Sequence, residues 1–364
     1  MVYKYILVRP FQSEDRNDNY LSRQHRTSRS CSGVVYVTVI TAMRFNKNEG
    51  AIITDTEAST VIRKYKHVKK ISGFTITGAV GQYAALVGGT GDLALIDETI
   101  TNARRDVNQE REHLGSVEDF LSLFAESANA TWREHLDAHI YSKLGVRMQD
   151  FLTGRFSTIR TGACGPKGEE AQLAPYILNH IFGIVEGESP AAAELPSSSY
   201  IMLTVDQINI GIHRADSNYC KPWRMSAIPY ACAGSGADLA DATLADYVDK
   251  LGRDHLDDID PLTGLNMLIW ATMRASNRNS GVGGVPQIGI IKENKIYDPE
   301  QERCKLASDI VRAGMNGFLP HEFHLHALER TLYDPKANPV RIYEDMKKKS
   351  MRKNLDAHLH GYLK

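Results

Sequence analysis

The chain has 364 residues, of which 42% are hydrophobic and 24% charged, and its net charge is −1. This amount of apolar material supports a sizeable core and excludes a wholly disordered chain. The 43 basic residues are balanced by 44 acidic ones, whereas a protein that coats nucleic acid needs a basic excess. We therefore expect a globular protein of about two domains with no nucleic-acid partner.

The N-terminal sequence and the cysteine pattern both indicate a reducing compartment. No apolar run approaches the roughly 20 residues of a membrane-spanning helix. The N-terminal apolar run Tyr5–Val8 is short and precedes the polar segment Gln12–Arg16, which is unlike a secretory signal. The five cysteines are scattered and contain no CxxC pair. We expect a cytoplasmic protein with no membrane partner and no metal or cofactor site.

The first third of the chain changes abruptly from polar to β-rich. Residues 11–33 are rich in Arg and Ser and predict a flexible leader. Val34–Phe45 is dense in β-branched residues and predicts a strand, and a second strand over Ala51–Thr54 ends at Asp55. Short strands are predicted near Lys66–Ile71 and Phe74–Val80. A glycine-rich break over Gly88–Gly91 then precedes a helix over Leu93–Ala103.

The middle of the chain is helical and then returns to strands. Ser116 fits a helix N-cap with Asp119 in the capping-box position, and Gly145 fits the C-terminal stop. The chain to Val185 remains mostly helical, and a loop follows. Three further strands are expected, over Tyr200–Val205, Ile208–His213 and Met225–Cys232.

The last third alternates helices with one hairpin. The Gly234–Gly236 stretch opens a helix, for which Ser235 also fits an N-cap. Another helix starts after Asp260-Pro261. Strands over Gln287–Ile291 and Lys295–Tyr297 flank a turn at Glu293-Asn294, and a mostly polar helical segment follows Cys304.

The order of elements predicts the fold class. Strands cluster instead of alternating with helices, so two antiparallel sheets covered by helices are favoured over a parallel doubly wound sheet. We expect an α+β protein with a leader over residues 1–33, a sheet domain over 34–303 and a helical C-terminal extension over 304–364.

This order resembles the proteasome β-subunit family and its bacterial threonine-peptidase relatives, which are N-terminal-nucleophile hydrolases with a four-layer αββα sandwich. Four stretches carry the resemblance: Thr38–Phe45 with Gly50–Ser59, Thr77–Gly81, Ala233–Ala237 and Asn277–Gly281. The resemblance covers roughly residues 34–297.

The resemblance implies a set of catalytic residues. Thr38 matches the nucleophile, whose own α-amine acts as base once the preceding residues are removed. The other matching positions are Asp55 as acid, Gly78 as oxyanion donor, and Ser235 and Ser280 as supporting hydroxyls. His67 stands at the position of the family's essential lysine, which a one-residue shift would give to Lys66. Glu57 replaces the usual Arg, and Asn277 replaces a second Asp.

Two functions follow from the resemblance. The first is a threonine-type peptidase or amide hydrolase that acts on a polypeptide or amide substrate after removal of residues 1–37 and self-assembles into a ring. The second is a catalytically inactive ring or scaffold subunit. The altered charges and Val37, which stands where the family has Gly, favour the second. The retained matches favour the first: Thr38, Asp55, Gly78, Ser235 and Ser280. Thr41 is a competing position for the nucleophile.

A histidine cluster in the C-terminal segment has two readings. His321 and His324 fall on one helical face, with Glu322 and His326 nearby, so a metal site is conceivable. An ordinary surface helix is favoured, because no second cluster of matching spacing exists.

Overall fold

The structure is a computed structural model of the whole chain. It describes residues 38–56, 58–59, 64–65, 69–78, 81–111, 113–153, 155–157, 170–185, 196–205, 209–219, 221–225, 227–252, 255–278 and 283–359. Contacts divide the chain into a unit over Met1–Gly33 and a unit over Val34–Lys364. All described residues belong to the second unit.

The first sheet has five strands in the order β12-β1-β2-β13-β14, and every neighbouring pair is antiparallel. Its strands are β1 (Ile40–Arg44), β2 (Glu49–Thr54), β12 (Tyr230–Ala233), β13 (Gln287–Lys292) and β14 (Lys295–Tyr297). The predicted turn at Glu293-Asn294 joins β13 to β14. Both residues have positive φ, 50° and 62°, as a tight hairpin turn needs.

The second sheet also has five antiparallel strands, in the order β11-β10-β9-β6-β5. Its strands are β5 (Ile71–Gly78), β6 (Gly81–Gly91), β9 (Ser198–Val205), β10 (Ile210–Asp216) and β11 (Trp223–Arg224). Two short ribbons, β3 (Ala58–Ser59) with β4 (Lys64–Tyr65) and β7 (Arg155–Ser157) with β8 (Glu170–Gln172), complete the pairing.

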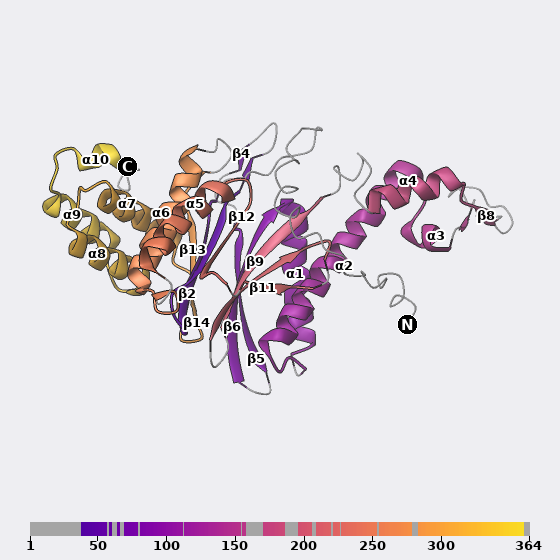
Figure 1. Cartoon of the computed structure of the whole chain (residues 1–364), viewed down its shortest axis with the longest axis horizontal. Helices are drawn as coiled ribbons and strands as arrows, with labels where there is room; N and C mark the ends of the chain where they lie inside the picture. The colour runs from indigo at the N-terminus through magenta and orange to yellow at the C-terminus, as the bar shows by residue number, and fades with distance from the viewer. Residues whose placement is uncertain are drawn as a thin grey trace. The chain divides into compact units, whose positions relative to one another are not determined.

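Helices cover the outer face of each sheet (Figure 1). On the second sheet, α1 (Leu93–Gln109) and α2 (Val117–Leu144) pack through aromatic contacts such as Phe124 against Tyr200, with ring centroids 5.2 Å apart. On the first sheet lie α5 (Ala237–Leu251) and α6 (Pro261–Arg278). Apolar side chains of both sheets, including Ile40, Ile52 and Leu203, form the layer between them. The predicted four-layer α+β architecture is confirmed.

The C-terminal segment is helical, as predicted, and shares the core of the first sheet. It comprises α7 (Gln301–Met315), α8 (His321–Tyr333), α9 (Pro339–Lys349) and α10 (Leu355–His358). Leu306, Ile310 and Met346 are fully buried in one cluster with α6 residues. The Tyr333 hydroxyl also donates to the carboxylate of Glu49, which is only 4% exposed. These helices are therefore anchored to β2 as well as to α6.

A smaller cluster surrounds the C-terminal part of α2. There α3 (Met148–Thr153) and α4 (Pro175–Val185) bury Ile181 and Ile184 against Leu136 and Ile140 of α2. The caps of α2 are as predicted. Ser116 and Asp119 form a reciprocal capping box, and Gly145 ends the helix with a φ of 69°.

Two sequence predictions about the sheets are wrong. The strand expected over Met225–Cys232 begins only at Tyr230, as β12. The expected glycine-rich break over Gly88–Gly91 is the end of β6, an 11-residue strand that runs from Gly81. The strand keeps glycines because neighbours leave no room there. A Cβ on Gly89 would lie 2.6 Å from Ile96 Cγ2, and one on Gly88 would lie 3.1 Å from Ile40 Cγ2.

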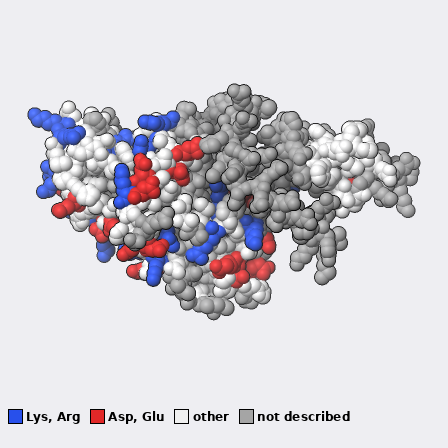
Figure 2. Space-filling model, in the orientation of Figure 1, with Lys and Arg blue, Asp and Glu red and all other residues white. Residues whose placement is uncertain are grey.

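Surface charge agrees with the balanced composition. Figure 2 shows basic and acidic side chains intermixed on the face in view. Among the described residues, no helix is both long and apolar enough to cross a membrane.

Candidate active site

Thr38 lies immediately before β1 and is only 3% exposed. Its hydroxyl accepts a hydrogen bond from Lys70 Nζ at 3.0 Å. Its backbone N–H donates to Ser235 Oγ at 3.2 Å, and its carbonyl accepts from Gly236 N–H at 3.3 Å. Three segments that are distant in sequence thus meet at this one residue.

Lys70 also forms a buried ion pair with Asp55. The two atoms Nζ and Oδ1 are 2.9 Å apart, and the side chains are 3% and 1% exposed. Backbone N–H groups of Val39 and Gly283 donate to the two Asp55 oxygens at 3.1 and 3.3 Å. Burial raises the pKa of Asp55, against the opposing effects of Lys70 and of these N–H groups. Asp55 is therefore held by donors on both oxygens, and Lys70 bridges it to Thr38.

A side chain from the first sheet positions Lys70. The N–H groups of Lys70 and Ile71 both donate to Gln287 Oε1, at 3.0 and 3.1 Å, and Gln287 Nε2 donates to Ile71 O at 3.3 Å. On its other side the Lys70 carbonyl accepts from Gly89 N–H of β6 at 3.2 Å. We call the three Gln287 bonds the Gln287 clamp. Because Gln287 belongs to β13 and Ile71 to β5, the clamp joins the two sheets beside the site.

Ser235 does not cap a helix, so that alternative is wrong. The N-cap of α5 is Gly236, which makes no side-chain capping bond. The Ser235 hydroxyl instead contacts Thr38, at 3.2 Å from its nitrogen and 3.4 Å from its carbonyl oxygen. Gly234 permits this approach. Its φ is 94°, and a Cβ there would lie 2.2 Å from Thr38 O.

Thr41, the competing nucleophile position, is placed for packing. Its hydroxyl lies 2.8 Å from the Thr272 hydroxyl of α6 and 3.4 Å from Ile53 O, and the residue is fully buried. Its hydroxyl therefore joins β1 to α6, whereas the Thr38 hydroxyl faces Lys70.

Gly78 is placed away from Thr38, so its expected role as oxyanion donor is wrong. It pairs with Gly81 at the far end of β5, whereas Ile71, next to Lys70, pairs with Gly88. At a rise of about 3.3 Å per residue, seven residues of strand separate Gly78 from Ile71 by roughly 23 Å. The glycines that lie beside Lys70 are those at the end of β6.

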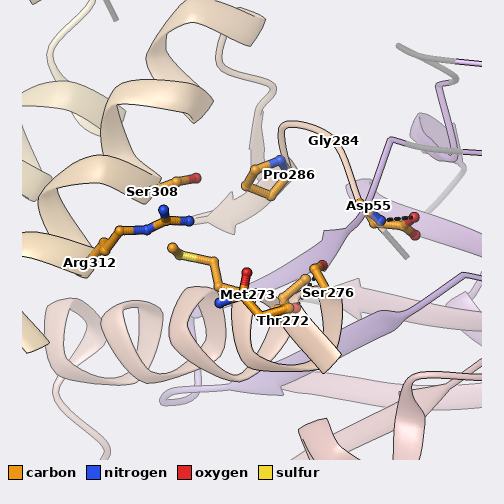
Figure 3. A pocket seen from close by; sticks show the side chains of 10 residues that line it. Asp55, Thr272, Met273, Ser276, Gly284, Pro286, Ser308 and Arg312 are labelled. Carbon is orange, nitrogen blue, oxygen red and sulfur yellow. Dashed lines mark hydrogen bonds between the residues drawn. The ribbon is translucent and has the colours of Figure 1, made fainter. Parts of the chain in front are cut away.

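Asn277 lies in the last turn of α6 and lines a cavity of about 120 Å³ that also reaches Asp55 (Figure 3). The other residues that line it are Thr272, Met273, Ser276, Gly283, Gly284, Pro286, Ser308 and Arg312. Ser280, His67, Lys66 and Glu57 lie outside the described residues.

Sequence reasoning missed Lys70, the residue that joins Thr38 to Asp55. The run Lys66–Lys70 resembled a solvated basic strand, and Lys69 behaves that way, with a side chain 60% exposed and paired with Asp298. Lys70 is 5% exposed. No local signal marked it: alternation in an extended segment places Lys70 on the face opposite to Ile71, yet both are buried, because Lys70 lies against Thr38 and Asp55.

One member of the C-terminal histidine cluster is buried. His324 is 2% exposed, and its Nε2 lies 2.8 Å from Asn266 Oδ1. Within the described ranges, no three His, Cys, Asp or Glu side chains are grouped so as to hold a metal ion.

Comparisons with known proteins give structural likeness only. No protein-family model matches the chain, and no curated protein matches it in sequence. Anbu (ancestral beta-subunit) from Yersinia bercovieri has a TM-score of 0.46 and 10% identity over 71% of this chain and 86% of that one. An Anbu mutant from Hyphomicrobium sp. strain MC1 has a TM-score of 0.45 and 10% identity over 71% and 84%. The helical assembly of the Anbu complex from Pseudomonas aeruginosa has a TM-score of 0.42 and 12% identity over 71% and 81%. Likeness at this level does not bear on activity, which rests on the chemistry of the site.

Proposed function

We propose that the protein is a threonine-type N-terminal-nucleophile hydrolase that cleaves peptide or related amide bonds with Thr38. One observation carries the proposal: the Thr38 hydroxyl is bonded to a buried Lys70, which is itself paired with Asp55 at 2.9 Å. A lysine ammonium fixed beside a hydroxyl stabilises the alkoxide and so lowers the barrier to nucleophilic attack.

The mechanism needs a free amine on Thr38. An α-amine has a pKa near 8, so about a tenth of it is unprotonated at pH 7 and can accept the hydroxyl proton. Thr38 Oγ1 then attacks the substrate carbonyl carbon, and the amine passes the proton to the leaving nitrogen as the C–N bond breaks. Water hydrolyses the resulting ester by the same route. Ser235 Oγ, which lies 3.2 Å from Thr38 N, would keep the amine oriented.

The oxyanion in this scheme needs backbone donors near Thr38. The end of β6 supplies a glycine-rich backbone next to Lys70, whose carbonyl accepts from Gly89 N–H. Gly234 lies between this strand and Thr38. A Cβ added to Gly234 would be 3.0 Å from Thr90 Oγ1 and 2.2 Å from Thr38 O. We therefore assign this role to the backbone of Gly88, Thr90 or Gly91 in place of Gly78, because the Gly89 N–H already donates to Lys70 O.

Processing is the first test. Intact mass and N-terminal sequencing of the purified protein should show a chain that begins at Thr38, with residues 1–37 removed. A chain that still begins at Met1, in a preparation that hydrolyses no peptide or amide, would overturn the proposal.

A pair of isosteric variants separates the two threonines. Thr38→Val should abolish processing and lower the hydrolysis rate by at least about 10³-fold, because the nucleophile is lost. Thr41→Val removes a buried hydroxyl from the packing between β1 and α6, so we expect lower stability with hydrolysis retained. The opposite pattern would assign the nucleophile to Thr41.

The alternative is a catalytically inactive ring or scaffold subunit. Asn277 favours it, because an amide near Asp55 supplies no second negative charge. An unprocessed, inactive chain that assembles in solution would support this alternative. Assembly into a ring is expected under both functions and is measured by light scattering on the purified protein. A cytoplasmic location stays a prediction.

A further inference from the structure

One face of α5 is acidic. Four exposed carboxylates lie on it, and we call them the acidic face: Asp238, Asp241, Asp246 and Asp249. At 3.6 residues per turn they fall within an arc of about 140° around the helix axis. Residues 237–260 contain eight Asp but only two basic residues. None of the four forms an ion pair with another described residue, and the pair found in this region joins Arg44 to Asp257 at 2.7 Å.

The end of α9 and the chain just after it are basic. Five exposed side chains lie there, and we call them the basic patch: Lys347, Lys348, Lys349, Arg352 and Lys353. The first two are paired with Asp356 at 3.0 Å and with Asp345 at 3.7 Å, whereas the other three form no ion pair within the described part of the chain. Basic residues in a last helical turn stabilise that helix. Arg352 and Lys353 follow the helix, so this effect does not explain them.

Part of the basic patch lines a hollow in the surface, with a volume of about 600 Å³. Lys347, Arg352 and Lys353 contribute to its walls, together with Met351, which is 60% exposed. A partner surface that fits this hollow is convex, carries negative charge and offers some apolar contact. The exposed face of α5 has these properties, because Ala242 is exposed among its carboxylates.

We propose that the basic patch of one copy of this chain docks against the acidic face of a second copy. Charge complementarity favours a second copy, because the same chain carries both surfaces and each surface repels its own kind. Since two different surfaces meet, the contact repeats from copy to copy, as a ring or a helical assembly requires. The inference rests on the self-assembly expected under both proposed functions, names the surfaces that make it, and does not depend on hydrolysis.

The first test is sedimentation velocity of the full chain at low and high salt. Between about 50 and about 500 mM sodium chloride the Debye length falls from roughly 14 to roughly 4 Å, which screens exposed charges. We therefore expect assembly at the lower salt and a Kd at least about tenfold higher at the higher salt. A chain that is monomeric at low salt, or an assembly that nuclease treatment dissociates, would overturn the proposal.

Two triple variants locate the contact by removing charge from one surface at a time. The first neutralises the acidic face with Asp241→Asn, Asp246→Asn and Asp249→Asn. The second neutralises the basic patch with Lys348→Gln, Lys349→Gln and Lys353→Gln. Each should raise the Kd of assembly at low salt by at least about tenfold, because three exposed charge pairs are lost.

A third triple variant is the matched control. It changes the net charge as the acidic-face variant does, but at three exposed carboxylates of α2: Glu118→Gln, Glu126→Gln and Glu134→Gln. This control should assemble with the Kd of the unmodified chain. A control that loses assembly as strongly as the acidic-face variant would show that net charge alone governs association, and would overturn the proposal.

Mixing the two surface variants gives the sharpest test. The basic-patch variant keeps its acidic face, and the acidic-face variant keeps its basic patch. One complementary pair of surfaces therefore remains in an equimolar mixture, which should form heterodimers and nothing longer. Heterodimers also show that both variants are folded. Loss of assembly in only one variant, unchanged assembly in both, or a mixture that stays monomeric would contradict the proposed contact.

Discussion

Lys69 and Lys70 are chain neighbours with opposite surroundings, and this contrast defines the site at the scale of single residues. Thr38, Asp55 and Ser235 were singled out through the resemblance to the proteasome β-subunit family, which rests on the order and spacing of several short motifs. Lys70 was not, since only the fold shows which lysine of the basic run turns inward. Gly78 was misplaced because glycine-rich strand ends occur at both ends of the β5–β6 hairpin.

Replacing Lys70 with methionine tests the buried pair. Lys70→Met leaves the Asp55 carboxylate without its cation, and breaking a buried pair in this way costs about 3–5 kcal/mol. Lys69→Met removes only a surface pair, which is worth about 0–1 kcal/mol. Denaturant unfolding measures both losses, and a peptide hydrolysis assay should show activity in Lys69→Met alone. Equal stability of the two variants would contradict the assignment of Lys70.

Gly234 offers a second test at this scale. Gly234→Ala places a methyl group 2.2 Å from Thr38 O in a residue with a φ of 94°. We expect loss of hydrolysis and a fall in Tm. Gly252→Ala is the matched control, because its φ is 78° and nothing lies within 4 Å of the added carbon. That control should lose only about 1–2 kcal/mol of stability, which is the cost of a left-handed backbone conformation in a residue with a side chain. If both variants behave alike, the contact with Thr38 has no effect on the site.

At the scale of elements, local sequence patterns predicted most of the strands and helices. They failed where packing against residues distant in sequence determines the local structure. The β-branched run before residue 45 and the capping box at Ser116 are local signals, and both marked real elements. β6 was missed because its glycines resemble a loop, although Ile40 and Ile96 exclude larger side chains there. The link between β13 and β5 is also invisible in sequence, because it depends on which sheets face each other.

The Gln287 clamp is testable as a connection between these strands. Gln287→Leu removes the acceptor for the N–H groups of Lys70 and Ile71, and each unsatisfied buried donor costs about 1–3 kcal/mol. We expect a lower Tm and slower hydrolysis. Gln287→Glu keeps an acceptor for these N–H groups but loses the donor to Ile71 O. Its Tm and hydrolysis rate should therefore fall less than those of Gln287→Leu. A Gln287→Leu protein with unchanged Tm and rate would show that Lys70 is held by β6 alone.

At the scale of the whole molecule, two buried histidines predict acid sensitivity. Burial lowers the pKa of His213 and of His324 from 6.5 to about 4. Each ring is neutral in the folded state and gains a proton more readily when unfolded, so its contribution is complete above pH 6.5. It is lost as pH falls from 6.5 to 4, by up to about 3 kcal/mol for each histidine.

Denaturant unfolding at pH 7.5, 6, 5 and 4 measures this loss. His324→Gln should reduce the slope of stability against pH below 6.5, because one of the two titrating groups is gone. His326→Gln, in the same helix but with a side chain 62% exposed, should leave the slope unchanged. A slope that is the same in all three proteins would assign the acid sensitivity to other groups.

The Gln287 clamp has a mechanical consequence. Its three bonds cross from β13 of one sheet to the start of β5 in the other. The layer between the two sheets consists largely of apolar side chains such as Ile40, Ile52 and Leu203. Apolar contacts tolerate small sliding movements better than directional bonds do. Any shear of one sheet over the other therefore pulls on the backbone of Lys70 and shifts its ammonium relative to Thr38. A partner protein that bound the outer helices of one sheet and shifted that sheet would therefore change the position of the Lys70 ammonium relative to Thr38.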